Sequence, residues 1–231
     1  MTDHQGRDAS TQQRWIRRAA IGGVVGPVLF VFGVIAAGAM YDDYSHVDQK
    51  ISELGGDGAQ HAIVQNVNFV VLGVLVLGFA WALARVCGRP LTGPALIAYF
   101  ALSSCIANAL LPCDPGCEGE STVGVLHIVT GLLGFIAAIA GMFVLARRWR
   151  SEPEWSTHAR VTKGAALAGS IGLVGFVVTQ AANATTYSGL AQRSFVIVLL
   201  AWIAVTALRL VYVIDSNAQD PDEARHPVGT S

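Results

Sequence analysis

Long apolar runs alternate with short polar segments along the whole chain. A helix needs roughly 20 apolar residues to cross about 30 Å of hydrocarbon, and each run is close to that length. The pattern therefore predicts an all-α fold, a bundle of six transmembrane helices. The runs cover residues 19–40, 62–84, 92–112, 123–146, 162–183 and 194–214.

The lysines and arginines between the runs are sorted to one side of the predicted membrane. Of the 15 in the chain, all but Lys50 and Arg193 fall in segments on the side of the N-terminus. Short loops rich in Lys and Arg stay in the cytoplasm, so both termini are expected inside.

The run pattern predicts a cytoplasmic N-terminal tail (1–18), a six-span membrane domain (19–214) and a cytoplasmic C-terminal tail (215–231). Both tails are polar enough to be disordered. Ala37-Gly38-Ala39 has the form of a signal-peptidase site, so a cleaved signal peptide is the alternative for the first run. That run is longer than a signal-peptide core of roughly 7 to 15 apolar residues, and we expect an uncleaved anchor.

Composition agrees with a membrane protein, because 53% of the residues are hydrophobic and only 13% are charged. The first partner is the lipid bilayer, and we expect a multi-pass protein of the plasma (inner) membrane. A net charge of -1 argues against a nucleic-acid partner. No Gly-rich phosphate loop, Cys-x-x-Cys pair or nucleophile elbow appears in the sequence, which argues against nucleotide hydrolysis and thiol–disulfide exchange.

Alternate runs resemble one another at their ends. The odd runs open with GPVL (26–29), GPAL (93–96) and GAAL (164–167), and the even runs close with ALAR, VLAR and TALR. These similarities predict three parallel two-helix hairpin repeats, an arrangement also found in transporters. Chance similarity is the alternative, since Gly, Ala and Leu are common in membrane helices.

Polar and titratable residues collect at the outer ends of the predicted spans. Polar groups in lipid are costly unless paired, so those in the spans should face one another across the bundle. We expect an outward-facing pocket that binds a small molecule or a lipid headgroup. The candidate ligand-binding residues are Ser52, Glu53, Asp57, Asn66, Asp114, His127 and Arg193.

Arg193 could bind a phosphate or carboxylate group with its planar guanidinium, and the alternative is an ion pair with Asp114 or Glu53. Because Ser52, Glu53, Asp114, His127 and Arg193 lie at similar depth, we expect at least three of them to share one cavity or to be hydrogen-bonded to one another.

Short motifs recur at the span ends and in the fourth and sixth runs: ISELG (51–55), LLPCD (110–114), His127, GLAQR (189–193) and Trp202. In these motifs the chain resembles domain-of-unknown-function family 998. The resemblance covers nearly the whole chain and implies a bacterial or archaeal membrane protein of six or seven helices. It implies no activity.

A metal-dependent lipid hydrolase is a second interpretation. Asp57 and His61 are four residues apart, and Asp114 and His127 could approach from the next hairpin to hold Zn²⁺ with an open position for water. The pattern loosely resembles the alkaline ceramidase superfamily, but the last span lacks that superfamily's His pair. Haem between His61 and His127 is disfavoured, because only one such pair is present.

Cys113 and Cys117 flank a Pro-Gly turn that could bring their sulfurs together. The alternatives are a disulfide, two reduced thiols, or a metal held beside His127, whereas Cys87 and Cys105 should be free thiols.

A purely structural interpretation also remains for each polar residue. His127 could donate to a carbonyl or to Asn108, and His46 and His158 could be exposed loop residues. Three classes are therefore open: a binding or transport protein, a lipid hydrolase, and a non-catalytic partner of another membrane protein.

The predicted topology is tested by single cysteines introduced into a Cys-free background. A membrane-impermeant thiol reagent applied to intact cells should label Ser45→Cys and Gly119→Cys and spare Ser151→Cys. Labelling confined to Ser151→Cys would contradict an inside location of the termini.

Overall fold

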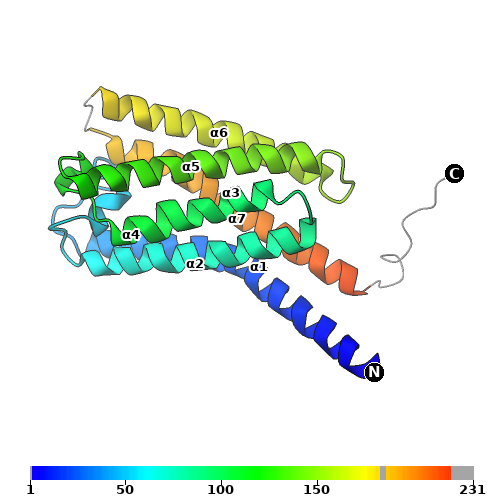
Figure 1. Ribbon diagram of the computed structural model, residues 1–231. Helices are drawn as coiled ribbons and strands as arrows, with labels where there is room; N and C mark the ends of the chain where they lie inside the picture. Colours follow the sequence, from blue (N-terminus) through cyan, green and yellow to red (C-terminus); the bar gives the residue numbers. More distant parts are fainter. Residues whose placement is uncertain (1, 183–185, 220–231) are drawn as a thin grey trace.

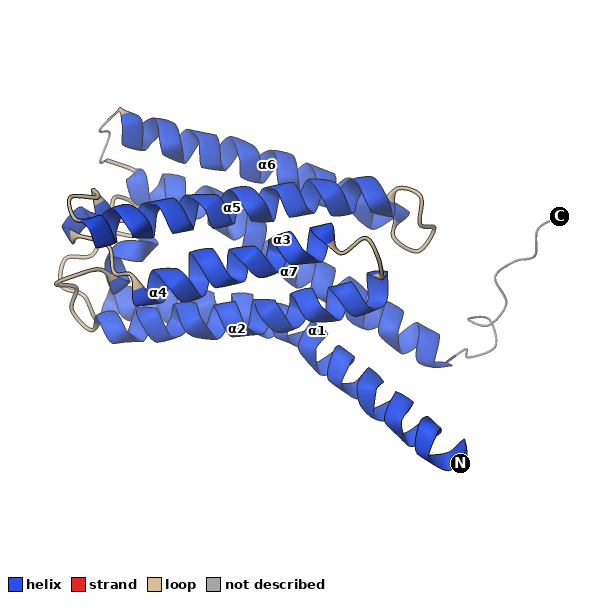
Figure 2. Cartoon of the chain, in the orientation of Figure 1, coloured by secondary structure: helices blue, strands red, loops and turns tan. Residues whose placement is uncertain are grey.

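The computed structural model is all-α, and its spanning helices run side by side (Figures 1 and 2). It describes residues 2–182 and 186–219. Within this part, six helical segments are long and apolar enough to cross a membrane, which confirms the predicted fold class. The helices are α1 (Thr2–Ala39), α2 (Ala62–Cys87), α3 (Thr92–Phe100), α4 (Asn108–Leu110), α5 (Thr122–Trp149), α6 (Ser156–Ala181) and α7 (Ser188–Gln219).

The third span is continuous but contains a π-helical segment, Ala101–Ala107, between α3 and α4. Ser103 Oγ donates to the carbonyl of Thr130 at 2.6 Å, and Ser104 Oγ donates to the carbonyl of Gly131 at 2.8 Å. A side chain at Gly134 would place its Cβ 2.0 Å from Ser104 Oγ. Small residues on α5 therefore let the π segment approach closely, as expected of helix packing in lipid.

The six spans form a closed ring. Each span packs against the span before it and the span after it in the chain, and α1 packs against α7 to complete the circle. The first residues of α1 and the last of α7 lie at one end of the bundle (Figure 1). The opposite end, here called the loop end, carries the connections 40–61 and 111–121.

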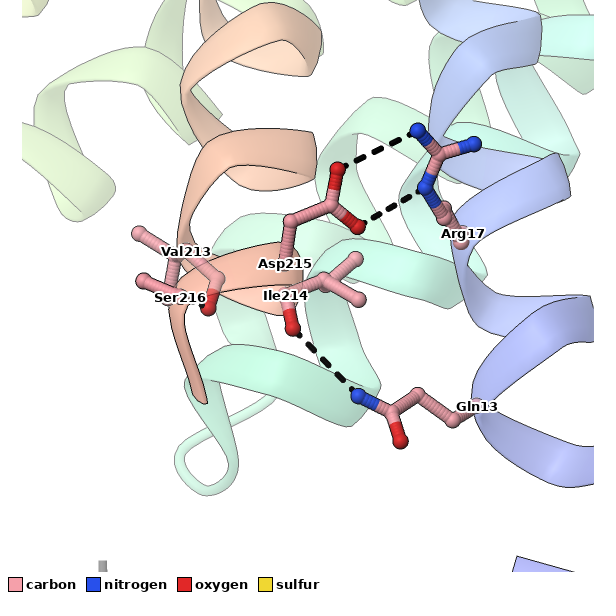
Figure 3. A network of polar contacts seen from close by, with 6 residues as sticks. All are labelled: Gln13, Arg17, Val213, Ile214, Asp215 and Ser216. Atoms are coloured by element: carbon pink, nitrogen blue, oxygen red, sulfur yellow. Dashed lines mark hydrogen bonds and ion pairs between the residues drawn. The ribbon is translucent and has the colours of Figure 1, made fainter. Parts of the chain in front are cut away.

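Polar contacts join the first and last helices near the end opposite the loop end (Figure 3). Arg17 Nε lies 2.8 Å from Asp215 Oδ1, and Gln13 Nε2 donates to the carbonyl of Ile214 at 3.3 Å. Because the ion pair is exposed, apolar packing along the helices contributes more to holding α1 against α7.

Two helix boundaries differ from the sequence prediction. α1 begins at Thr2, so residues 2–18 continue the first span as helix where disorder was expected. α6 begins at Ser156 rather than near residue 162, because Trp155 stacks on Trp149 with ring centroids 4.6 Å apart and anchors the earlier start.

His158 is buried, and its expected exposed position in a loop was wrong. Its ring lies 5.5 Å from that of Trp149, and its Nε2 is 2.9 Å from Thr206 Oγ1. The predicted end of the fifth span at Asn183 and most of the predicted C-terminal tail lie outside the described residues. The hairpin repeats and the membrane orientation stay predictions.

Candidate functional site

The ring of helices encloses a cavity of about 750 Å³ at the loop end. Every one of the six spans contributes to its wall. The part of the wall inside the bundle is apolar and rich in aromatic rings, which come from Phe30, Phe69, Phe100, Phe135, Phe176 and Phe195. Phe135 and Phe195 meet edge to face with centroids 4.8 Å apart, so the rings support one another.

The cavity is bounded at the loop end by two short segments, residues 48–53 and 116–118, here called the roof. The 3₁₀ turn Ile51–Gly55 forms part of the first segment, and most of that turn is buried. Polar side chains concentrate here, in contrast to the aromatic wall. Those that line the cavity at or beside the roof are Asp48, Gln49, Lys50, Ser52, Glu53, Asn108, Glu118, His127 and Gln192.

The start of α7 holds the first roof segment. The backbone N–H groups of Gly189 and Leu190 donate to the carbonyls of Asp48 and Val47, at 3.1 and 2.8 Å. Ser188 Oγ also donates to the carbonyl of Asp48. The first N–H groups of a helix lack acceptors within the helix, and here carbonyl groups of the first loop act as their acceptors.

Arg193 on α7 also binds the first loop. It donates to the carbonyl of Gln49 at 2.8 Å, to Tyr44 Oη at 2.7 Å and to His46 Nδ1 at 3.1 Å. Burial raises the pKa of Tyr44 and lowers the pKa of His46, and neither group adds a negative charge near the guanidinium at neutral pH. Arg193 therefore fixes the loop and does not line the cavity.

Lys50 is a roof residue whose role the sequence analysis missed. Its side chain is buried, and Nζ donates to the carbonyl of Gly116 at 2.7 Å and to that of Cys117 at 3.4 Å. Burial lowers the pKa of this ammonium group, and Glu53 and Glu118 act in the opposite direction. One feature of the sequence indicated a role for Lys50: it is the one lysine in the segments between the spans at the loop end.

Gln192 is a second missed residue, although it lies in the GLAQR motif. Its Oε1 accepts from the backbone N–H of Ile51 at 2.6 Å, and its Nε2 lies 3.5 Å from Ser52 Oγ. Ser52 faces the cavity beside it. The side chain of Gln192 therefore ties α7 to the ISELG segment, about 140 positions away in the sequence.

His127 and Asn108 extend the polar region from the roof into the wall. His127 lies 2.6 Å from the carbonyl of Leu111 through Nδ1. Since a carbonyl only accepts, Nδ1 carries the proton, and Nε2 of the neutral ring is left with a lone pair. Asn108 Oδ1 accepts from Thr130 Oγ1 at 2.7 Å, and within the described part of the chain its amide nitrogen has no hydrogen-bond partner.

A disulfide joins Cys117 of the roof to Cys113 beside it, while Cys87 and Cys105 are free thiols. Cys117 Sγ lies 3.5 Å from Ser52 Oγ and lines the cavity. Cys113 is fully buried, and its carbonyl accepts from the backbone N–H of Asp57 at 2.7 Å. The second roof segment is thus fastened to the first.

Asp114 stabilises the start of α5 instead of facing the cavity. Its carboxylate accepts from the backbone N–H of Ser121 at 3.0 Å and from Ser121 Oγ at 2.5 Å, and these hydrogen bonds lower the pKa of Asp114. Ser121 Oγ in turn accepts from the N–H of Gly124 at 3.0 Å and caps the helix.

The structure therefore separates the predicted ligand-binding residues into two groups. Ser52, Glu53 and His127 line the same cavity, and a ligand site there stays a prediction. The others do not line it. Asp57 is exposed, and Asn66 Nδ2 donates to the carbonyl of Gly55 at 3.1 Å. Neither Asp114 nor Glu53 pairs with Arg193 within the described part of the chain.

The predicted zinc ligands do not come together. Asp57 and His61 are both exposed, and His61 precedes α2 in a left-handed conformation instead of sharing a helical face with Asp57. Among the described residues, the group of His, Cys, Asp and Glu that could hold a metal is Cys113, Cys117 and His127.

The six apolar helices define the class of this protein as a multi-span helical membrane protein. The chain belongs to the family described as Protein of unknown function (DUF998), whose profile matches residues 24–209. This match confirms the resemblance seen in the short motifs. No curated protein and no solved structure matches the chain.

The N-cap of α5 provides a test of the structural role given to the Asp114 region. Ser121→Ala should destabilise the protein by about 1 kcal/mol, because the N–H of Gly124 loses its acceptor. The measurement is reversible unfolding in mixed micelles. Ser194→Ala is the matched control, since its hydroxyl only donates within its own helix, and it should change stability by less than about 0.5 kcal/mol. Equal effects would contradict the capping role.

Proposed function

We propose that this protein binds a lipid-like amphiphile in the cavity, with the polar end of the ligand at the roof and its apolar part among the aromatic rings. The observation that carries the proposal is the division of the cavity into a polar roof and an apolar interior. A volume of about 750 Å³ lies within the usual range for ligand pockets.

The polar end offers several hydrogen-bond donors. Lys50 Nζ has three N–H groups and donates to the carbonyls of Gly116 and Cys117, which leaves capacity for a ligand. The Asn108 amide and the Ser52 hydroxyl add further donors at the cavity surface. This set favours a head that presents acceptor oxygens, such as a carboxylate, phosphate or carbonyl group.

The apolar end favours a hydrocarbon or isoprenoid chain over a sugar or an amino acid. Phe69, Leu72, Phe100 and Leu200 line the interior, where a polar ligand would leave its own hydrogen-bonding groups without partners. An apolar chain carries no such cost, and it gains dispersion contacts with the rings.

The sorted basic residues support the orientation expected from the sequence, with the roof on the outer side of the plasma membrane. In that orientation the polar head would be held at the depth of the outer lipid headgroups. A ligand could then exchange with the outer leaflet or with the space beyond it.

A larger side chain that fills the cavity should prevent ligand binding, and two adjacent residues of α5 provide the variant and its control. Leu132 lines the cavity, whereas Leu133 is 46% exposed on the surface that would face lipid. Leu132→Trp should lower the affinity for a dansyl-labelled single-chain fatty acid at least about tenfold, a loss of about 1.4 kcal/mol of binding free energy. Dansyl fluorescence with delipidated protein in detergent measures the binding.

Leu133→Trp is the matched control and should bind the probe as the wild type does. Both variants should elute as monodisperse protein, so that misfolding is separated from loss of the site. Equal binding by the two variants, or no saturable binding by the wild type, would contradict the proposal.

A further inference from the structure

Three soft or borderline metal ligands meet at the edge of the roof. The sulfurs of Cys113 and Cys117 and a ring nitrogen of His127 all lie within 4.8 Å of one another, and all three residues are buried. They come from the segment before α5 and from the first turns of α5 itself. Burial distinguishes this cluster from the exposed acidic groups at the same end of the bundle.

One ring nitrogen of His127 is already hydrogen-bonded to the backbone. Its Nδ1–H donates to the carbonyl of Leu111, which fixes the ring and leaves the lone pair of Nε2 available. Metal-bound histidines commonly donate their second ring N–H to a carbonyl or carboxylate, and this contact sets the tautomer and raises the basicity of the ligand nitrogen.

We infer that the dithiol form of Cys113 and Cys117, together with His127, is a binding site for Zn²⁺, and that the disulfide is the form without metal. Tetrahedral zinc with bonds of about 2.3 Å to sulfur and 2.0 Å to nitrogen keeps its ligand atoms about 3.5 to 3.8 Å apart. The ring nitrogen of His127 lies within 4.8 Å of both sulfurs, and reduction of the disulfide would free the two sulfurs to move apart to this separation.

Charge balance favours a divalent ion in this buried position. Two thiolates and a neutral imidazole carry two negative charges, which Zn²⁺ neutralises, so that the cluster itself carries no net charge. Cys117 and His127 both line the cavity, and the fourth position would therefore open toward it, where water or the head of a ligand could bind.

The two forms exclude each other because a disulfide sulfur is not a thiolate. A dithiol reductant converts the disulfide to two thiols and is itself oxidised to a disulfide, with transfer of two electrons and two protons. Zinc then displaces the two thiol protons. The roof would thus report the redox state of its compartment through its metal content, whether or not the cavity binds an amphiphile.

The test uses the full-length Cys87→Ser/Cys105→Ser protein in detergent, in which only the roof pair remains. Protein purified with a dithiol reductant should show two alkylatable thiols on denaturation and take up one Zn²⁺ per chain, measured by elemental analysis after desalting. Air-oxidised protein should take up none. Co²⁺ should give thiolate-to-metal charge-transfer absorbance only in the reduced sample.

Two histidine variants separate the site from general thiol binding. His127→Ala should weaken Zn²⁺ binding by at least about tenfold, whereas His61→Ala, which removes an exposed histidine at the same end, should leave it unchanged. The comparison of the reduced and oxidised forms needs no substitution at His127, so it stands if His127→Ala fails to fold.

Several results would overturn the inference: equal Zn²⁺ uptake by reduced and oxidised protein, no uptake by the reduced form, unchanged affinity in His127→Ala, or a roof pair that stays oxidised under the reductant. None of these outcomes depends on the binding of an amphiphile, which the Leu132→Trp comparison tests separately.

Discussion

The arrangement at the loop end depends on hydrogen bonds between non-helical backbone and the start of α7. Irregular backbone at the end of a membrane bundle must find partners for its polar groups. Here the N–H groups of Gly189 and Leu190 donate to the roof, and Arg193 donates to Gln49, Tyr44 and His46. These contacts fold residues 41–53 inward over the ring instead of leaving them as a mobile outer loop.

A roof held in this way changes what the helices enclose. The ring brings aromatic side chains from every part of the chain toward one space, and the roof closes that space with polar groups. The π segment of the third span contributes as well, because it places Ser104 and Cys105 on the cavity wall, directly before Asn108. Such segments are frequent at functional sites in helical proteins. Together these features give the cavity a polar and an apolar end.

The spans could be predicted from sequence because length and apolarity alone decide which segments cross a bilayer. The side-chain partners could not, since they join residues far apart in the chain. Arg193 was expected to bind an anionic ligand group or to pair with Asp114 or Glu53, yet it donates to the carbonyl of Gln49 and to Tyr44, some 150 positions away. His127 lines the cavity, whereas Asp57 and His61 do not share a helical face, because the helix that their spacing implied begins only at Ala62.

The central claim is that the ring and roof enclose one cavity that is polar at the loop end and apolar inside, and that an amphiphile occupies it. Cryo-electron microscopy of the protein in lipid nanodiscs, bound to an antibody fragment for alignment, measures this directly. The account predicts elongated non-protein density that runs from beside Ser52 and His127 to the rings of Phe100 and Phe135. Side chains that fill this space, or a cavity that holds only water, would contradict it.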